Sequence, residues 1–457
     1  MGKRPSDVKK QKLIDRWSPG YSLLRAYVSL CLKKIFYSRV EVFHEVKLPG
    51  NRPLIIAPNH QNALMDALNV LANLRQQPIF LARADLFKKP VIANILASMK
   101  LAPIFRIRDG KETLKQNDEV FENAVGILER KNIITMFPEG NHGDKEMLRV
   151  LKKGIPRIAF LSEQKNDFGL DLQIIPVGIN YSDYYKFRSE VFICFGKPFG
   201  MDDFRKDFEK NPPLAFTAFN ERLSVELKKV MIHISDEAHY ELIQLLRTIY
   251  LNLIHSEKGM KLNNLKEKFM AAKEMISKLE IVQETDADSY EKLMQKTKSY
   301  QNHLIKLKLD DRNFIKIRSN FIGALASTFI MVLLLPAFVF GLVWNILPYQ
   351  IPIWFCKTKI EDKQFNSSVF FVLASLVTFP LFYFAFSVLA FFLTKFWIAL
   401  IFIVFLPITG LFAYYYTRFF GKLLKRFRLK FYMCKNNADL KEALKLREEI
   451  IEKLIVI

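Results

Sequence analysis

Residues 54–66 have the sequence Leu-Ile-Ile-Ala-Pro-Asn-His-Gln-Asn-Ala-Leu-Met-Asp. The apolar run Leu54–Ala57 predicts a buried strand, and Ala63–Leu74 after it predicts a helix. His60 therefore stands where a strand ends, and the carboxylate of Asp66 follows closely. A histidine beside a carboxylate is a candidate general base with an orienting partner. Because a single histidine at a strand end is more often structural, the pair alone does not decide the function.

The spacing of this pair restricts its geometry. Five residues separate His60 from Asp66, and positions six apart do not share a face of a regular helix. Asp66 can therefore support His60 only if the turn after Asn59 is irregular, or if a bulge takes up the additional residue. Asn62 is a weaker substitute partner. We expect Asn59 to hold this turn or to cap the following helix.

Short apolar strands alternate with helical stretches through the first half of the chain. The strands are predicted at Val40–His44, Leu54–Ala57, Ile79–Ala82, Ile133–Phe137, Ile174–Ile179 and Glu190–Phe195. The helices are predicted at Ala63–Leu74, Val91–Met99, Asn117–Lys131 and Ile155–Lys165. Such alternation predicts an α/β domain with a largely parallel sheet, in which the site lies on loops at the strand ends.

Three further blocks follow the His60 block in order: Pro103-Ile104-Phe105-Arg106, Phe137-Pro138-Glu139-Gly140 and Ile174-Ile175-Pro176-Val177. Together the four blocks resemble the glycerolipid acyltransferase family, the lysophosphatidate and glycerol-3-phosphate acyltransferases. The resemblance covers roughly residues 30–210, and Phe-Pro-Glu-Gly is its most specific part.

The chain departs from the common family pattern in two places. The commonest form has four residues between the histidine and the aspartate, whereas the form with five resembles a branch that includes the yeast-type glycerol-3-phosphate/dihydroxyacetone-phosphate acyltransferases. In the third block, Asn141-His142 stands where the common pattern has Thr-Arg.

The resemblance implies an O-acyltransferase that moves a fatty acyl group from acyl-CoA or acyl carrier protein to a glycerol-phosphate acceptor. The default acceptor is lysophosphatidate (1-acyl-sn-glycerol-3-phosphate), which gives phosphatidate in phospholipid biosynthesis. The five-residue spacing and the long helical segment favour glycerol-3-phosphate or dihydroxyacetone phosphate as the alternative. An acceptor outside the glycerolipids also stays open.

The resemblance also implies roles for individual residues. His60 is the expected general base, and Asp66 the catalytic residue that fixes its tautomer. The substrate-binding candidates are Arg106, Arg108, Glu139, Gly140 and Asn59. Arginines at 106 and 108 suit a phosphate and would share one face of an extended stretch. We expect Glu139 to orient an arginine or the acceptor hydroxyl, and Gly140 to allow close backbone approach to a ligand.

Neither a metal-ligand cluster nor a glycine-rich nucleotide loop is apparent in the sequence, so we expect no bound cofactor. The acyl-CoA or acyl carrier protein acts as a co-substrate. The four cysteines, at positions 31, 194, 356 and 434, have no metal-binding spacing, and free thiols are expected.

The composition divides the chain into five expected parts. These are a basic N-terminal segment with an amphipathic helix (1–38), the acyltransferase domain (39–213), a helical, coiled-coil-like segment (214–310), a transmembrane region (321–417) and a basic C-terminal tail (418–457). The N-terminal helix, Tyr21–Tyr37, lies either on an anionic membrane surface or packed on the domain. A break near Thr285–Asp288 predicts the turn of a helical hairpin.

Three long runs in the transmembrane region carry no charged residue: Phe321–Trp344, Ser367–Thr394 and Phe396–Thr417. Each exceeds the length of about 18 apolar residues that a membrane-spanning helix needs. Basic residues flank both ends of the region, which places both flanks in the cytoplasm and requires an even number of crossings. We therefore expect two to three spans, with Pro336 marking the first run as the re-entrant candidate, and a catalytic domain that faces the cytoplasm.

Charge and composition bear on the partners. The formal net charge of +22 predicts an anionic partner, and the 41 phenylalanines in a chain that is 50% hydrophobic favour anionic membrane lipid over nucleic acid. Two other classes stay open. A non-catalytic membrane scaffold would not need His60, Asp66, Arg106 and Glu139 together, and a nucleic-acid binder would show salt-dependent binding. The oligomeric state is not predicted.

Overall fold

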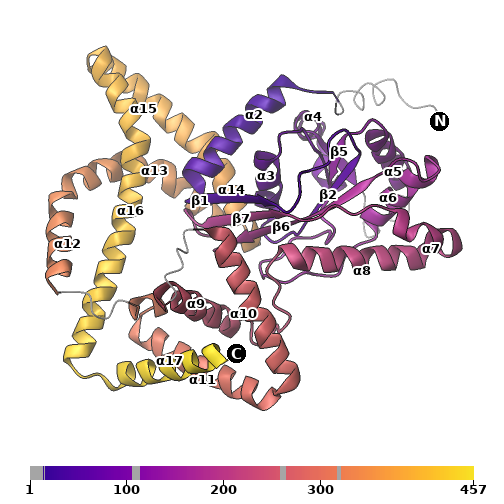
Figure 1. Cartoon of the computed structure of the whole chain (residues 1–457). Coiled ribbons are helices and arrows are strands. Elements are labelled where there is room, and N and C mark those ends of the chain that lie inside the picture. Colours follow the sequence, from indigo (N-terminus) through magenta and orange to yellow (C-terminus); the bar gives the residue numbers. More distant parts are fainter. Residues whose placement is uncertain (1–13, 15, 105–113, 258–263, 316–320, 457) are drawn as a thin grey trace. The chain divides into compact units, whose positions relative to one another are not determined.

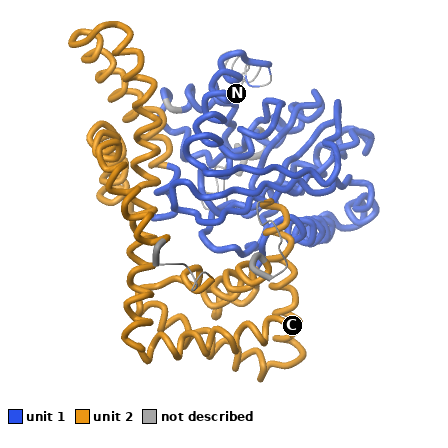
Figure 2. The backbone as a smooth tube through the Cα atoms, turned by 60° about the vertical axis from the view of Figure 1, so that its left-hand side comes forward, with its two compact units in different colours: residues 1–233, 362–368 blue, residues 234–361, 369–457 orange. Residues whose placement is uncertain are grey.

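The computed structural model describes residues 14, 16–104, 114–257, 264–315 and 321–456. The chain divides into two compact units (Figure 2). Unit 1 comprises residues 1–233 and the short distant segment 362–368, and unit 2 comprises residues 234–361 and 369–457. The sequence placed the end of the first domain at residue 213, but helix α8 (Pro212–Val230) groups with the sheet, so unit 1 continues to His233.

A seven-stranded sheet forms the centre of unit 1, with the order β1-β7-β6-β2-β5-β3-β4. All neighbouring strands are parallel except β6 and β7. The strands are β1 (Arg39–His44), β2 (Leu54–Pro58), β3 (Ile79–Arg83), β4 (Leu101–Ile104), β5 (Ile133–Thr135), β6 (Gln173–Tyr181) and β7 (Glu190–Phe195). The predicted α/β domain with a largely parallel sheet is therefore confirmed.

All six predicted strands are present, with ends that differ by at most two residues. The sequence analysis missed β4, which pairs with β3 in parallel register from Leu101 to Ile104. This strand is short and contains Pro103, which lacks a backbone donor and normally argues against a strand. It lies at the edge of the sheet, where a proline is tolerated because one side of the strand needs no ladder bonds.

Seven helices accompany the sheet in the described part of unit 1 (Figure 1). They are α2 (Pro19–Leu30), α3 (Ala63–Asn73), α4 (Pro90–Ser98), α5 (Leu114–Glu129), α6 (Gly154–Lys165), α7 (Arg205–Lys210) and α8, with short helical turns at η1 (Cys31–Phe36), η2 (Ala84–Phe87) and η5 (Asp202–Phe204). Helix α2 starts at a serine cap, since Ser18 Oγ accepts the Tyr21 N–H at 3.2 Å. It buries Tyr21 and Val28 while Leu23 and Leu30 stay exposed, so one face packs on the domain and an apolar face remains open.

Helix α8 packs closely on strand β6. A Cβ atom added to Gly178 of β6 would lie 1.8 Å from the Val230 carbonyl oxygen at the end of α8, so only glycine fits there. Asn180, on the same face of β6, donates from Nδ2 to that carbonyl at 3.1 Å. Side chains alternate along a strand, so Tyr181 points to the opposite face, where it contacts α3. Strand β6 thus connects α8 with the helix that follows His60.

Four polar helices form the charged part of unit 2: α9 (Tyr240–Glu257), α10 (Leu265–Thr285), α11 (Ala287–Leu307) and α17 (Ala438–Val456). Helices α10 and α11 form the predicted hairpin, whose turn lies at Asp286, and Asp286 caps α11 by accepting the Ser289 N–H at 3.0 Å. Buried Asp311, in the short turn η6 (Asp311–Asn313), accepts hydrogen bonds from Tyr300 and Arg447 at 2.8 and 2.7 Å. This carboxylate joins α11 to α17.

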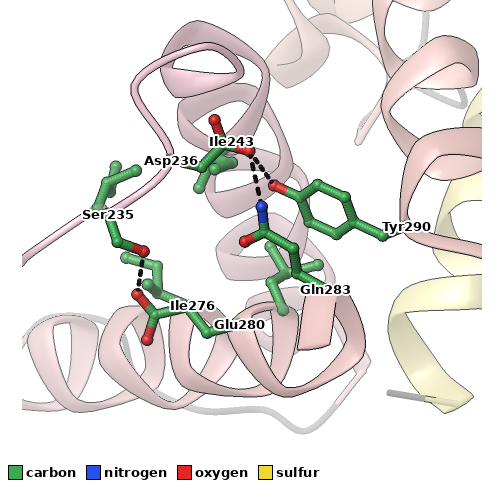
Figure 3. Close-up of a pocket in the computed structure, with 9 residues that line it drawn as sticks. Ser235, Asp236, Ile243, Ile276, Glu280, Gln283 and Tyr290 are labelled. Carbon is green, nitrogen blue, oxygen red and sulfur yellow. Dashed lines mark hydrogen bonds between the residues drawn. The ribbon is translucent and has the colours of Figure 1, made fainter. Parts of the chain in front are cut away.

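A second carboxylate, Asp236, lies before α9 and joins this helix to the hairpin (Figure 3). It accepts hydrogen bonds from the Tyr290 hydroxyl at 2.8 Å and from Gln283 Nε2 at 3.3 Å, and contacts His239 Nδ1 at 2.8 Å. The small pocket drawn in Figure 3 has a volume of about 10 Å³, the space of one water molecule. We therefore read this cluster as a structural junction of three helices.

The apolar part of unit 2 is helical. Its elements are α12 (Phe321–Leu333), α13 (Leu335–Lys359), the end of α14 (Asn366–Val372), the turn η8 (Leu373–Thr378), α15 (Phe379–Leu393) and α16 (Phe396–Cys434). The turn η7 (Lys363–Phe365) and the first three residues of α14 group with unit 1. Three helical stretches are long and apolar enough to cross a membrane: Leu335–Lys359, Lys363–Leu393 and Phe396–Cys434. Asn345 ties α13 to both later helices, since its Nδ2 donates to the Leu406 carbonyl at 3.2 Å and its Oδ1 accepts the Tyr383 hydroxyl at 2.6 Å.

The first predicted span, Phe321–Trp344, is wrong in its position. Helix α12 ends at Leu333, and the long apolar helix starts at Leu335 and continues to Lys359. Pro336 lies in the first turn of α13, where proline is favoured because the N–H groups of a first turn have no acceptor within the helix.

Candidate active site

The candidate site lies at the carboxyl end of the central strand β2. Asn59 follows β2 directly, and its side chain bonds to the backbone of Ile179 on β6, with Oδ1 accepting the N–H at 2.7 Å and Nδ2 donating to the carbonyl at 3.2 Å. Asn59 therefore extends the pairing of the two strands beyond their regular ends. It holds the turn, one of the two alternatives expected, and the N-cap residue of α3 is Asn62.

His60 and Asp66 are brought together by the irregular turn that the spacing required. His60 precedes the helix, α3 begins only at Ala63, and Ala63 takes up the additional residue with a positive φ of 43°. His60 Nδ1 lies 2.9 Å from Asp66 Oδ2. The same oxygen accepts the backbone N–H groups of Gln61 and Asn62 at 2.8 and 2.7 Å. The turn thus surrounds a fully buried carboxylate with hydrogen-bond donors.

The other oxygen of Asp66 is held by a buried tyrosine. Tyr181 donates its hydroxyl to Asp66 Oδ1 at 2.6 Å, and Asn69 Nδ2 donates to Tyr181 at 3.1 Å and to the Tyr37 hydroxyl at 3.3 Å. Burial, followed by the negative charge of Asp66, raises the pKa of Tyr181 well above its ordinary value, so this group stays a donor. Together these contacts fix the position of Asp66, and through Asp66 the orientation of the His60 ring.

The ring of His60 is held by stacking and remains partly accessible. Phe137 of the third sequence block stacks on it, with ring centroids 4.0 Å apart. The His60 side chain is 15% exposed. Because Nδ1 is engaged by Asp66, Nε2 is the nitrogen that can meet a substrate, and among the described residues it has no hydrogen-bond partner. This arrangement suits a general base with a defined tautomer.

Glu139 lies beside His60 and binds an arginine. Its Oε1 accepts the His60 backbone N–H at 2.8 Å, and its Oε2 accepts Arg149 Nε at 2.9 Å. Burial raises the pKa of the Glu139 carboxyl, and the hydrogen bonds from His60 and Arg149 counteract that effect. One of the two roles expected for Glu139, orienting an arginine, therefore has a partner in the structure.

Sequence reasoning missed Arg149. Beyond Glu139, its guanidinium donates to the carbonyl of His142 at 2.7 Å and to that of His60 at 3.4 Å, and its side chain remains 36% exposed. The third block offered a signal, because Asn141-His142 occupies the place of Thr-Arg in the common pattern. The block lacks the arginine of the common pattern, so an arginine from later in the chain can take its place. In this structure Arg149 is the arginine that bonds to Glu139.

Gly140 is required by the backbone. It has φ +71°, and its N–H donates to the Phe137 carbonyl at 3.2 Å in a tight turn. A Cβ here would also lie 3.1 Å from Lys152 Cγ. The turn brings the following residues back toward His60, since the Gly143 N–H donates to the His60 carbonyl at 3.0 Å. These contacts account for Gly140 without a ligand.

His142 is the other side chain of the third block at the site. Its ring lies edge-on to that of His60, with centroids 5.6 Å apart, and its Nε2 is 3.7 Å from Asp362 Oδ2. Burial lowers the pKa of His142, and His60 lowers it further, while Asp362 acts in the opposite direction.

Arg106 and Arg108 lie outside the described residues. The strand before them, β4, ends at Ile104, and β3 and β4 run parallel to β2 and β5 through the sheet. The carboxyl end of β4 therefore lies on the same side of the sheet as the carboxyl end of β2, where His60 follows. No cluster of three or more histidine, cysteine or acidic side chains suited to a metal ion occurs in the part of the chain that the structure describes.

We expect Arg149→Ala to weaken both the fold and the site. Removing the guanidinium leaves a buried carboxylate with one charged partner fewer, which lowers the free energy of unfolding by about 1–3 kcal/mol. Because Glu139 also holds the His60 backbone, any turnover that depends on His60 falls by roughly tenfold. Thermal unfolding in detergent measures the first effect. Arg157→Ala, an exposed arginine on α6, is the matched control, and equal melting temperatures for the two variants would contradict the expected role.

Comparison with known proteins gives one family match. Residues 39–180 match the family model described as Acyltransferase. This range contains all four sequence blocks, including His60, Asp66 and Glu139.

Two curated relatives from Saccharomyces cerevisiae are similar to the chain. One is glycerol-3-phosphate O-acyltransferase 1, 31% identical over 135 residues, which are 29% of this chain and 18% of the relative. The other is glycerol-3-phosphate O-acyltransferase 2, 29% identical over 114 residues, which are 25% of this chain and 14% of the relative. The chain thus covers less than a fifth of the length of either relative.

Among solved structures, the chain resembles the crystal structure of the 1-acyl-sn-glycerophosphate (LPA) acyltransferase PlsC from Thermotoga maritima. The identity is 21%, the TM-score is 0.33, and the match covers 46% of this chain and 78% of that one.

Proposed function

We propose that this chain, whose residues 39–180 form a domain of the acyltransferase family, is a membrane-bound enzyme that esterifies a glycerol-phosphate acceptor with a fatty acyl group. The observation that carries the proposal is the His60–Asp66 pair, with Nδ1 and Oδ2 2.9 Å apart and the ring held on Phe137. The acyl donor is acyl-CoA or acyl carrier protein, acting as a co-substrate.

The chemistry follows from the orientation of His60. Nε2 takes the proton of the acceptor hydroxyl as its oxygen attacks the thioester carbonyl. The carbon–sulfur bond of the resulting tetrahedral intermediate then breaks, and the thiolate leaves with the proton that His60 held. Asp66, bonded to Nδ1, stabilises the imidazolium between the two steps, as a carboxylate does in a serine-protease triad. Since the acceptor hydroxyl is itself the nucleophile, no acyl-enzyme forms.

The acceptor phosphate needs a cationic site. We propose that Arg106 and Arg108 supply this cationic site, because β4, the strand before them, ends on the same side of the sheet as β2, the strand before His60. Glu139 and Gly140 contribute indirectly, through Arg149 and through the turn at Phe137.

We propose glycerol-3-phosphate as the acceptor. Both curated relatives are named as glycerol-3-phosphate acyltransferases, and they match over part of the chain only. The spacing of five residues between His60 and Asp66 also favours glycerol-3-phosphate, because it resembles the yeast-type branch of the family. Lysophosphatidate, which would give phosphatidate, is the competing acceptor, and dihydroxyacetone phosphate is the close alternative.

The location is part of the proposal. Three helical stretches are long and apolar enough to cross a membrane, and Arg418, Lys422 and Lys425 follow the last apolar run. The positive-inside tendency then puts the catalytic unit on the cytoplasmic face of an anionic membrane. Oligomeric state has no part in the proposal.

An assay with parallel acceptors tests the function. Purified protein in detergent receives labelled acyl-CoA with glycerol-3-phosphate, dihydroxyacetone phosphate or lysophosphatidate. We expect the highest kcat/KM with glycerol-3-phosphate. Conversion of lysophosphatidate alone would overturn the acceptor and keep the enzyme class. No product with any acceptor, from either acyl-CoA or acyl carrier protein, would favour the non-catalytic scaffold.

A further inference from the structure

A short segment from the apolar part of the chain belongs to the catalytic unit. Asp362–Ser368, here called the inter-span segment, follows one stretch long and apolar enough to cross a membrane, Leu335–Lys359, and overlaps the start of the next, Lys363–Leu393. Its contacts nevertheless group it with residues 1–233 (Figure 2). Such a grouping needs specific attachments, and the described residues show two.

The first attachment reaches the His60 turn through Tyr184. Buried Ser367 donates its hydroxyl to the Tyr184 carbonyl at 2.5 Å, although 183 residues separate the two in sequence. The same carbonyl accepts Asn62 Nδ2 at 3.1 Å, and the Tyr184 hydroxyl donates to Gln61 Oε1 at 2.8 Å. Both Gln61 and Asn62 also donate their backbone N–H groups to Asp66. Tyr184 therefore connects the segment to the turn that holds His60 and Asp66 together.

The second attachment is to His142. The ring of Phe365 meets the ring of His142 edge-on, with centroids 4.5 Å apart and planes at 77°. On the same imidazole, Nε2 lies 3.7 Å from Asp362 Oδ2. The ring of His142 also lies edge-on to that of His60, with centroids 5.6 Å apart. His142 therefore contacts both the inter-span segment and the candidate base, and its side chain is only 14% exposed.

We infer that the inter-span segment is part of the active site, and that Phe365 is a positioning residue that acts on His60 through His142. Edge-to-face packing of two rings restrains both, and it restrains His142 at the place where the common family pattern has an arginine. An imidazole needs such support because it is shorter than an arginine and makes fewer hydrogen bonds. This inference rests on the proposed function for its kinetic consequence, but not for its structural one.

The segment also links the site to the apolar helices by chain connectivity. Helix α13 ends at Lys359, only Ile360 and Glu361 precede Asp362, and the next apolar stretch begins at Lys363, inside the segment. If the apolar stretches on either side enter a bilayer, His142 contacts a segment that lies at its surface.

Chemical modification of His142 tests the structural part without any need for turnover. Diethyl pyrocarbonate reacts with accessible neutral imidazoles, and mass spectrometry of the full-length protein in detergent gives the rate at His142. We expect Phe365→Ala to raise this rate at least threefold and Phe365→Leu to give an intermediate rate. Phe365→Tyr, which keeps the ring, and Lys363→Ala, an exposed neighbour in the same segment, should stay within about 1.5-fold of wild type.

Kinetics test the positioning part. We expect Phe365→Ala to lower kcat by roughly tenfold with the acceptor KM within about twofold, because the reacting geometry is lost and the phosphate site is not. Phe365→Tyr should restore kcat to within about twofold. If Phe365→Ala does not fold, as judged by gel filtration and melting temperature, Phe365→Leu decides the result.

Unchanged modification of His142 in the folded Phe365 variants would overturn the inference whatever the activity. A wild-type kcat in Phe365→Ala would overturn the positioning role. Failure of the proposed function looks different, because wild-type protein would then give no ester while His142 still became more reactive in Phe365→Ala.

Discussion

Replacing His60 with alanine is expected to reduce kcat by about 10²–10⁴-fold, the range that general-base catalysis contributes. No other described side chain has the same position, because the ring is fixed between Asp66 at 2.9 Å and Phe137 at 4.0 Å with Nε2 left for the substrate. His142 is the nearest second imidazole, but its ring centroid is 5.6 Å away, and it is held by Asp362 and Phe365. The loss is measured as initial rate of ester formation at saturating substrate.

The fold should survive this change. His60 precedes α3, and among the described residues its side chain forms a hydrogen bond with Asp66 and with no backbone group, so alanine removes a partly exposed ring and leaves the turn in place. A melting temperature within a few degrees of wild type checks this. His44→Ala is the matched control, since His44 is an exposed histidine at the end of β1 that stacks on Phe195 at 4.5 Å. A wild-type kcat in His60→Ala would contradict the mechanism. An equally large loss of kcat in His44→Ala would show that the effect is not specific to His60.

Asp66→Asn is expected to lower kcat by roughly 10²–10⁴-fold while the protein stays folded. The amide keeps an oxygen for His60 Nδ1 and for the N–H groups of Gln61 and Asn62, and its NH₂ replaces the oxygen that accepts the Tyr181 hydroxyl. The tautomer of His60 can therefore persist, but the negative charge that stabilises the imidazolium is lost. The measured quantities are kcat and the melting temperature of the same preparation.

A comparison of two substitutions at this position separates charge from structure. Asp66→Ala leaves two backbone N–H groups and a buried hydroxyl without their acceptor, so this variant should lose stability as well as activity. Asp144→Asn, which changes an exposed carboxylate shortly after the third block, is the control for loss of one negative charge nearby. Wild-type kcat in Asp66→Asn would mean that Asp66 acts only on the fold.

Local patterns in the sequence predicted much of unit 1. Predicted runs of four to six residues between turn signals became strands β1, β2, β3, β5, β6 and β7, since the buried strands of a parallel sheet are rich in apolar residues. The spacing of His60 and Asp66 also predicted an irregular turn, and Ala63 at φ 43° provides it. Strand β4 was missed because it has only four residues, one of them Pro103, and its pairing with β3 is not visible in a local pattern.

The remaining parts of the site depend on contacts between residues that are distant in sequence. Arg149 reaches Glu139 from outside the motif, so a motif comparison has no position for it. Ser367 contacts Tyr184 across 183 residues, and nothing in the composition of an apolar helix end marks it as part of a catalytic unit. Pro336 is a local signal for the start of the first long apolar helix at Leu335, but hydropathy alone merged α12 with α13.

One measurement tests the central claim, that the chain transfers an acyl group with His60 as base. Full-length wild-type protein and His60→Ala are purified in the same detergent, incubated with labelled acyl-CoA and glycerol-3-phosphate, and the lipid products are identified by mass spectrometry. The account predicts a labelled monoacylglycerol phosphate from the wild-type protein and only background from His60→Ala. Equal amounts of this product from both proteins would contradict it.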